Sequence, residues 1–268
     1  MIGFDLRFHQ FNLAWKLALA LKSHASPALL NSYESERLPV IAEMLNITTE
    51  LSKELEYKSE TRRGIEAAQA QAAQKDKDEE KLYKRDWKLF QLDVNYRWSE
   101  IVFDERLTTE AGNDRVERHA YGTAGHDVRA GDRAPDAPAL ISIVDNASGT
   151  PSVRLFDVFK PTAHTALIFT SDPSGASVSN LLAPFSKVPK EFFQFALVIP
   201  SGTEGNVESV LAGVSHTFID SEGHAYSGYG LRPSEEEMWV VIVRPDGMIG
   251  AFAKSTEGLE KYLSLVFS

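Results

Sequence analysis

The sequence predicts an α+β fold in which long amino-terminal helices precede a domain of alternating strands and helices. Two observations support this division. Residues 11–57 carry apolar side chains at helical spacing, whereas short apolar runs alternate with helical patterns after about residue 130. We therefore expect a helical part at 1–103, a linker at 104–128 and an α/β domain at 129–268.

The helical part is expected to contain three helices. The first covers 11–22, where leucines recur every four residues without an internal glycine or proline. Ser26 and Pro27 have the residue types of a helix cap and a first helical position, so a second helix begins there. Pro39 is expected to begin the third helix, an amphipathic rod that runs to about residue 57.

The stretch between the helices and the second domain carries weaker signals. Residues 58–80 join an Ala/Gln-rich piece to a run of mixed charges, which indicates an exposed helix or a connector. Residues 82–92 are amphipathic again. Residues 104–130 are polar, contain three glycines and read as a loop.

The second domain shows a strand, helix and strand followed by two strands and a helix. The expected strands are 153–158, 165–170, 192–199, 238–243 and 248–252, and the expected helices are 175–187 and 257–267. Pro245-Asp246-Gly247 supplies the last hairpin turn, because proline presets one dihedral angle and glycine tolerates positive φ. A βαβ unit followed by a ββα unit is the order of a thioredoxin-like fold.

Composition excludes several classes of protein. The 38 acidic and 28 basic residues give a formal charge of −10, which argues against nucleic acid and an anionic membrane as partners. No apolar run approaches the roughly 20 residues of a membrane span, and the amino terminus lacks a secretory pattern. Cysteine is absent, which excludes disulfides and thiol redox chemistry. We expect a cytoplasmic protein.

The first forty residues carry the most specific motif. Phe-Asn-Leu-Ala-Trp-Lys-Leu-Ala-Leu-Ala-Leu-Lys at 11–22 is followed by Ser-Tyr-Glu-Ser-Glu-Arg-Leu-Pro at 32–39. These residues resemble the segment that closes the FAD site in flavin-dependent aromatic hydroxylases of the phenol 2-monooxygenase type. In that family a complete dinucleotide-binding domain precedes this segment. The chain therefore resembles a truncated hydroxylase without the FAD-binding Rossmann portion, and 1–103 is expected to be its middle region.

Three further stretches agree with this resemblance. Residues 93–102 match an aromatic-rich, strand-like stretch of the family. Arg-Ala-Gly-Asp-Arg-Ala-Pro-Asp at 129–136 resembles the entry to thioredoxin-like domains, including the phenol hydroxylase C-terminal domain. Residues 243–250 resemble the closing hairpin of that domain. In the family this domain is structural and helps to form the dimer, and here Ser171 and Ser174 stand where a thiol site would need cysteine.

The resemblance also implies what a flavin site needs. The family uses a Gly-rich turn, a Gly-Asp element, and a Gly/Asn-rich turn that ends in Asp-Ala just before the Asn-Leu-Ala-Trp-Lys helix. The first two elements are not found here, and His9 and Gln10 stand where the family has Asp-Ala. We therefore expect no FAD and no other cofactor, and without a flavin we expect no hydroxylation.

The candidate catalytic residues are Asp5, Arg7, His9 and Tyr96. The first three form an ionisable cluster at the position of the family's flavin turn. One interpretation is acid–base groups in a pocket that the flavin has vacated, and the other is solubilising residues on an exposed surface. No pair of the seven histidines has a metal-ligand spacing, so no metal is expected.

Other prominent side chains in the motif are expected to be structural. Glu36 or Glu34 is expected to pair with Arg37 or with a neighbouring helix and to anchor the turn. Trp15 and Trp98 are expected to fill the core.

Two classes of function remain open. The first is a flavin-monooxygenase-like protein that has lost hydroxylation and acts as a dimerising structural or interaction protein. Helices that pack on a flavin domain in the family need another partner here, which favours a homodimer or a separate flavin-domain chain. The second is a cofactor-independent isomerase, dehydratase or cyclase of specialised metabolism, acting on an aromatic or polyketide-like molecule. A third reading is that the sequence is part of an ordinary, longer hydroxylase.

Overall fold

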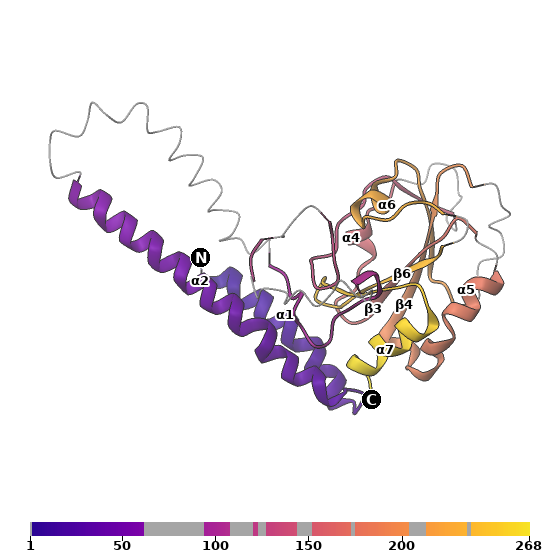
Figure 1. Ribbon diagram of the computed structural model, residues 1–268, viewed down its shortest axis with the longest axis horizontal. Helices are drawn as coiled ribbons and strands as arrows, with labels where there is room; N and C mark the ends of the chain where they lie inside the picture. The colour runs from indigo at the N-terminus through magenta and orange to yellow at the C-terminus, as the bar shows by residue number, and fades with distance from the viewer. Residues whose placement is uncertain are drawn as a thin grey trace.

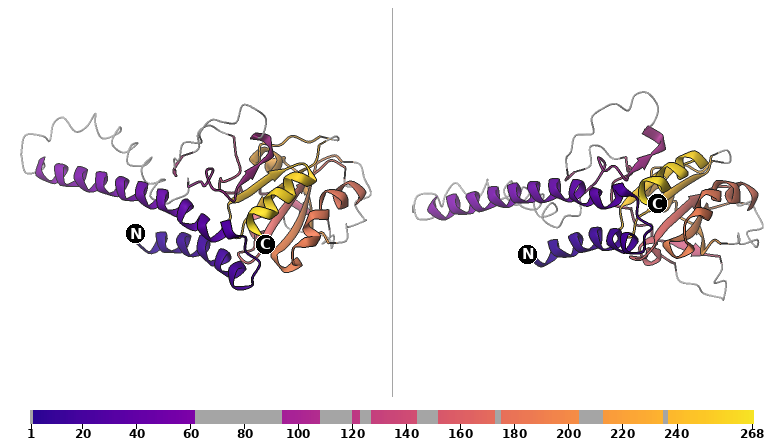
Figure 2. Two further views of the ribbon diagram at one scale, coloured as in Figure 1. Left: turned by 60° about the horizontal axis from the view of Figure 1, so that its bottom comes forward. Right: turned by 90° about the horizontal axis from the view of Figure 1, so that it is seen from below.

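The protein consists of a helical hairpin that packs against one mixed β-sheet (Figures 1 and 2). The structure is a computed structural model that describes residues 2–61, 94–107, 120–122, 127–143, 152–172, 175–203, 213–234 and 237–268. In these ranges the α-helices are α1 (Ile2–Leu21), α2 (Pro27–Thr61), α4 (Leu155–Val158), α5 (Gly175–Leu181), α6 (His224–Gly228) and α7 (Thr256–Val266). The 3-10 helices are η2 (Glu105–Leu107), η3 (Ala183–Lys187) and η4 (Lys190–Phe192).

Seven strands form the sheet, in the order β1-β7-β6-β3-β4-β5-β2. Their bounds are β1 (Phe103–Asp104), β2 (Leu140–Ser142), β3 (His164–Phe169), β4 (Phe193–Pro200), β5 (His216–Asp220), β6 (Trp239–Val243) and β7 (Ile249–Ala253). Strands β3, β4 and β5 are parallel, and β6 is antiparallel to both β3 and β7. The predicted order, β3-α5-β4 followed by β6-β7-α7, is confirmed, and so is the α+β class.

The sheet separates two hydrophobic clusters. Alternate residues of each strand point to opposite faces, as the twofold period of a strand requires. One cluster contains Ile168, α7 and, from the helical hairpin, Trp15, Leu19 and Leu29. The other lies on the α4 and α6 side and contains the neighbouring strand residue Leu167. The hairpin thus covers part of the sheet of its own chain.

Pro39 lies in the middle of α2, so the expected start of a third helix there is wrong. Proline has no N–H, and it therefore leaves the carbonyl oxygen of Ser35, four residues earlier, without its helical donor. The indole Nε1 of Trp98 donates a hydrogen bond to that oxygen at 2.8 Å. A contact from a distant part of the chain satisfies the acceptor, and the helix continues to Thr61.

Three other local expectations need correction. The first helix begins at Ile2, nine residues before the predicted start at 11. The described part of the segment expected as strand-like, 94–102, is not a strand, because Val94 forms an isolated bridge and the residues after it form turns. The segment 153–158 contains helix α4 instead of a strand. Asp136 Oδ1 accepts a hydrogen bond at 3.1 Å from the backbone N–H of Phe156 in the first turn of α4. This bond satisfies a donor that has no partner within the helix, and it therefore supports helix formation at 155–158.

Several expectations fall on residues that the structure does not describe. They concern 62–80, 82–92 and most of the loop at 108–126, together with Ser174. The division into domains with boundaries at 103 and 128 stays a prediction. None of the helices in the described ranges has the length and apolar character needed to cross a membrane.

Candidate functional site at the buried Glu36 network

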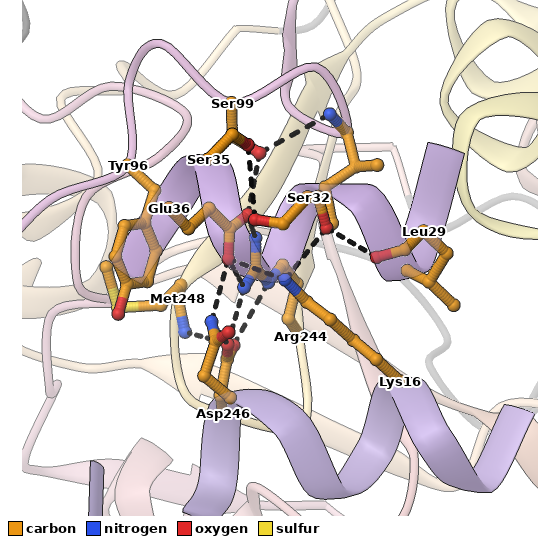
Figure 3. A network of polar contacts seen from close by, with 12 residues as sticks. Lys16, Leu29, Ser32, Ser35, Glu36, Tyr96, Ser99, Arg244, Asp246 and Met248 are labelled. Atoms are coloured by element: carbon orange, nitrogen blue, oxygen red, sulfur yellow. Dashed lines mark hydrogen bonds and ion pairs between the residues drawn. The ribbon is translucent and has the colours of Figure 1, made fainter. Parts of the chain in front are cut away.

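The motif at 11–39 builds a buried polar network between the two long helices. Helix α1 contributes Asn12 and Lys16, and α2 contributes Ser32 and Glu36. Each pair is four residues apart and therefore lies on one face of its helix. The two faces meet across the hairpin, and Lys16 reaches over to both Ser32 and Glu36 at 2.8 Å (Figure 3).

The carboxylate of Glu36 accepts five hydrogen bonds (Figure 3). Its Oε1 accepts from Ser99 Oγ at 2.6 Å and from Arg244 Nη1 at 2.8 Å. Its Oε2 accepts from Asn12 Nδ2 at 2.7 Å, Lys16 Nζ at 2.8 Å and Arg244 Nη2 at 3.0 Å. One carboxylate thereby joins α1, α2, the turn after Val94 and the hairpin between β6 and β7.

The charges in this network compensate one another. The side chains of Lys16, Glu36 and Arg244 have no exposed area. Burial alone would raise the pKa of Glu36, but Arg244 and Lys16 outweigh it and hold that pKa well below its usual range. Burial lowers the pKa of Lys16 to about 8 despite the adjacent Glu36. For Arg244, Asp246 and Glu36 overcome burial and raise the pKa above its ordinary value.

The tight turn between β6 and β7 presents Arg244 to this network. Gly247 adopts a φ of +78°, and its N–H donates to the Arg244 carbonyl oxygen at 2.9 Å. Asp246 accepts from Arg244 Nε at 3.0 Å and from the N–H of Met248 at 3.4 Å. The predicted turn is confirmed, and its arginine is oriented by the aspartate two residues later.

Tyr96, one of the catalytic candidates, is buried next to Arg37. The guanidinium Nη1 of Arg37 donates to Tyr96 Oη at 2.6 Å. Burial raises the pKa of Tyr96 to about 12, although Arg37 opposes the shift. The phenol is therefore protonated near neutral pH, and it is a poor general base there.

A small cavity lies beside this pair. It has a volume of about 20 Å³ and is lined by Phe11, Asn12, Arg37, Val94, Tyr96, Arg133, Asp246 and Met248. The buried Oδ1 of Asn12 has no hydrogen-bond partner. A space of this size holds about one water molecule, and it is far smaller than an aromatic substrate or a flavin ring.

The remaining catalytic candidates are placed only by their backbone. Asp5, Arg7 and His9 lie in α1, but their side chains are outside the part that the structure describes. Of the four candidates, only the surroundings of Tyr96 are therefore known. The helical backbone of α1 occupies the position where the resemblance placed a flavin-binding turn.

The structure separates the alternatives for Glu36. Its partners include Lys16 on the neighbouring helix and Arg244, whereas Arg37 bonds to Tyr96. Trp15 fills the core as predicted, at 5% exposure.

Sequence reasoning missed the roles of Asn12, Lys16 and Arg244. The available signals were a lysine among the apolar residues of 13–21 and an Arg–Asp pair flanking the proline of a predicted turn.

Comparisons with known proteins agree on one group of relatives. Residues 8–48 match a family model described as an FAD binding domain. The chain is 33% identical over 159 residues to a flavin-dependent monooxygenase of Mycobacteroides abscessus, covering 59% of this chain and 23% of that protein. It is 27% identical over 251 residues to pentachlorophenol 4-monooxygenase of Sphingobium chlorophenolicum, covering 92% of this chain and 38% of that protein.

A solved structure shows the same fold over nearly the whole chain. The crystal structure of the flavin-dependent monooxygenase PieE, in complex with FAD and substrate, matches 96% of this chain with a TM-score of 0.55 and 18% identity. The match covers 42% of PieE. The chain therefore spans less than half the length of each of these three relatives.

Proposed function

The chain is related to the flavin-dependent monooxygenases, and we propose that its described residues form a structural unit that does not itself bind FAD. The observation that carries this proposal is the Glu36 network. Asn12, Lys16 and Glu36 of the segment that matches an FAD binding domain direct their polar groups at one another. These side chains hold the hairpin to the sheet, and apart from Asn12 Oδ1, which adjoins the small cavity, their polar groups are engaged with one another.

The residues present do not fit a flavin. From residue 6 of α1 onward, backbone N–H groups are already bonded to carbonyl oxygens four residues earlier, so they are not available to a flavin ring. The cavity beside Asn12 and Tyr96 is about 20 Å³, which excludes the isoalloxazine. The proposal is therefore that the unit lacks FAD-dependent hydroxylation.

The same dimensions disfavour a cofactor-independent isomerase, dehydratase or cyclase at this place. Such an enzyme would need Tyr96 to face a pocket that admits an aromatic or polyketide-like molecule. Tyr96 is instead 4% exposed and hydrogen-bonded to Arg37. We therefore favour the structural role.

The role that we propose for this unit is self-association. Several large apolar side chains of the hairpin are exposed, among them Phe11 at 51%, Leu21 at 86%, and Leu38 and Leu45 at 60% each. Exposed apolar groups on neighbouring helices favour an interface. A twofold dimer would cover both copies at once, and a separate chain that carries a flavin domain is the other candidate partner.

We also assign the sheet to the thioredoxin-like, phenol hydroxylase C-terminal type. The supporting observations are the βαβ and ββα order and the Arg-Pro-Asp-Gly turn at 244–247. In this assignment the domain acts without a thiol, because the chain has no cysteine. Its part in the unit is to supply Arg244 to the Glu36 network.

Two measurements on the purified chain test this proposal. NADPH oxidation is followed with FAD and a phenol present, and no turnover above the enzyme-free rate is expected. Light scattering at micromolar concentration is expected to give twice the chain mass of 29.7 kDa. Phenol-dependent NADPH turnover would overturn the loss of hydroxylation, and a mass of one chain would overturn the dimer.

A further inference from the structure

A second and larger cavity lies at the carboxyl ends of three neighbouring parallel strands. Ser171 follows β3, Pro200 ends β4, and Asp220 ends β5, and all three residues line this cavity. Its volume is about 890 Å³, within the range of small-molecule sites. Ligands of open α/β sheets bind in the crevice outside the carboxyl ends of the strands, so the location is that of a binding site.

The described lining combines hydroxyl groups, apolar surfaces and one carboxylate. The polar residues are Ser171, Ser201, Thr203, Asp220, Ser227 and Ser234, and the apolar ones include Pro200, Leu231 and Pro233. Lysine, arginine and histidine are not among the described lining residues. A phosphate or carboxylate ligand would therefore find no charged partner there and would be repelled by Asp220.

Asp220 lacks one hydrogen-bond partner. The residue is 1% exposed, and its Oδ2 accepts the backbone N–H of Tyr226 at 2.9 Å. Its Oδ1 is buried and has no partner. Leaving a buried carboxylate oxygen without a donor is unfavourable, and a charged donor is the most effective remedy.

We propose that this cavity binds a small organic cation whose primary ammonium group donates to Asp220, directly or through one water molecule. The hydrocarbon part of the ligand lies against Pro200 and Leu231, and the surrounding hydroxyl groups complete the hydrogen bonds. A metal ion fits less well, because the described residues contain no group of three or more His, Asp or Glu that could hold one. The ligand binds without covalent chemistry, and its binding does not require a flavin.

Three probes with the same four-carbon chain test the ligand class. Butylammonium, butanol and butyrate are titrated separately into isotope-labelled protein, and backbone amide resonances are followed by NMR. Butylammonium is expected to shift the Tyr226 amide saturably, because that N–H is bonded to Asp220. Binding of butanol and butyrate should be weaker by about tenfold or more. Equal responses to the three probes, or no saturable shift with butylammonium, would overturn the proposal.

Three variants locate the interaction. Asp220→Asn keeps an oxygen acceptor for Tyr226 and removes the charge, so butylammonium binding should fall by about tenfold or more. Asp157→Asn makes the same charge change on the exposed side of α4 and should leave binding unaltered. Ser227→Phe fills the cavity while Asp220 stays in place, and it should abolish binding. Unchanged binding to either the Asp220 or the Ser227 variant would contradict the site.

Discussion

The indole Nε1 of Trp98 donates to the carbonyl oxygen of Ser35, the oxygen that Pro39 leaves without a helical donor. This single bond lets α2 continue as one helix past the motif that carries Glu36. It also attaches the helix to the turn that supplies Ser99 to the Glu36 carboxylate. The proline of the motif and the tryptophan 59 positions later therefore act as a pair.

This pairing predicts the result of a double-mutant cycle. Trp98→Phe keeps an aromatic ring and removes the donor, and it should destabilise the protein by about 1 kcal/mol. In a Pro39→Ala background the restored N–H satisfies Ser35, so the same substitution should cost much less. Urea unfolding of the four proteins measures the coupling. An equal cost of Trp98→Phe in both backgrounds would show that the indole bond does not replace the helical one.

The buried carboxylate at the centre of the network predicts a large stability effect. Glu36→Gln leaves Lys16 without its charged partner and Arg244 with Asp246 alone, and it should cost about 3–5 kcal/mol. Glu34→Gln makes the same change on an exposed position of α2 and should stay within about 0.5 kcal/mol. Urea unfolding measures the loss of unfolding free energy in each variant, from the midpoint of the transition when the dependence on urea concentration is unchanged. If the two variants were equally stable, the network would not hold the hairpin.

A buried histidine predicts how stability depends on pH. His164 is 1% exposed, its Nε2 has no hydrogen-bond partner, and it stacks on Phe193. Burial, with a smaller effect of Arg244, lowers its pKa from 6.5 to about 3. As the pH falls, the imidazole of the unfolded chain therefore binds a proton at a higher pH than that of the folded chain. The stabilisation that His164 provides is complete above pH 6.5 and is lost as the pH falls below it. The loss between pH 6.5 and 4.5 should be about 2–3 kcal/mol.

The lowered pKa of Glu36 acts in the same direction but at a lower pH. Its stabilisation is present above about pH 4.5 and is lost below it. Unfolding free energies measured from pH 6.5 to pH 4.5, below the pKa of Lys16 and above the range of Glu36, therefore isolate the histidine. His164→Phe should flatten this part of the profile, and His224→Gln on an exposed side chain should not. A profile of His164→Phe that still falls like the wild type would assign the loss to other groups.

Gly131 predicts a steric effect that can be separated from backbone strain. It has a φ of +95°, and an added Cβ would lie 2.5 Å from the backbone nitrogen of Arg97. Gly131→Ala should therefore destabilise by more than the roughly 1–2 kcal/mol that positive φ alone costs. Gly213 has a φ of +106° with nothing within 4 Å, so Gly213→Ala measures the strain by itself. Thermal unfolding of the two variants measures both effects. Equal decreases in unfolding temperature would show that the backbone at Arg97 moves aside.

The sheet could be predicted where its strands are apolar throughout. Strands β3, β4, β6 and β7 are buried on both faces, and such strands form continuous apolar runs that are visible without knowledge of their neighbours. The short elements β2, β5 and α6 carry no comparable signal and were not predicted. The helix at Pro39 was predicted wrongly because its continuation depends on Trp98, a partner far along the chain.

The candidate site could be predicted only in part, for the same reason. The motif predicted an anchoring role for Glu34 or Glu36 without deciding between them, and the structure gives this role to Glu36. Its partner Arg244 lies 208 positions away, and no local pattern links the two. The isolation of Tyr96 from an open pocket depends on how Arg37 and the hairpin turn pack around it. Such packing is a property of the assembled fold.

The visible spectrum of the purified protein, recorded before and after incubation with FAD and desalting, shows whether this chain binds the flavin. In the matched segment Asn12, Lys16, Ser32 and Glu36 bond to one another in a buried network, and the adjacent cavity is about 20 Å³. We expect a colourless protein in both samples. A flavin absorption band that survives desalting would contradict it and would show that this chain binds FAD.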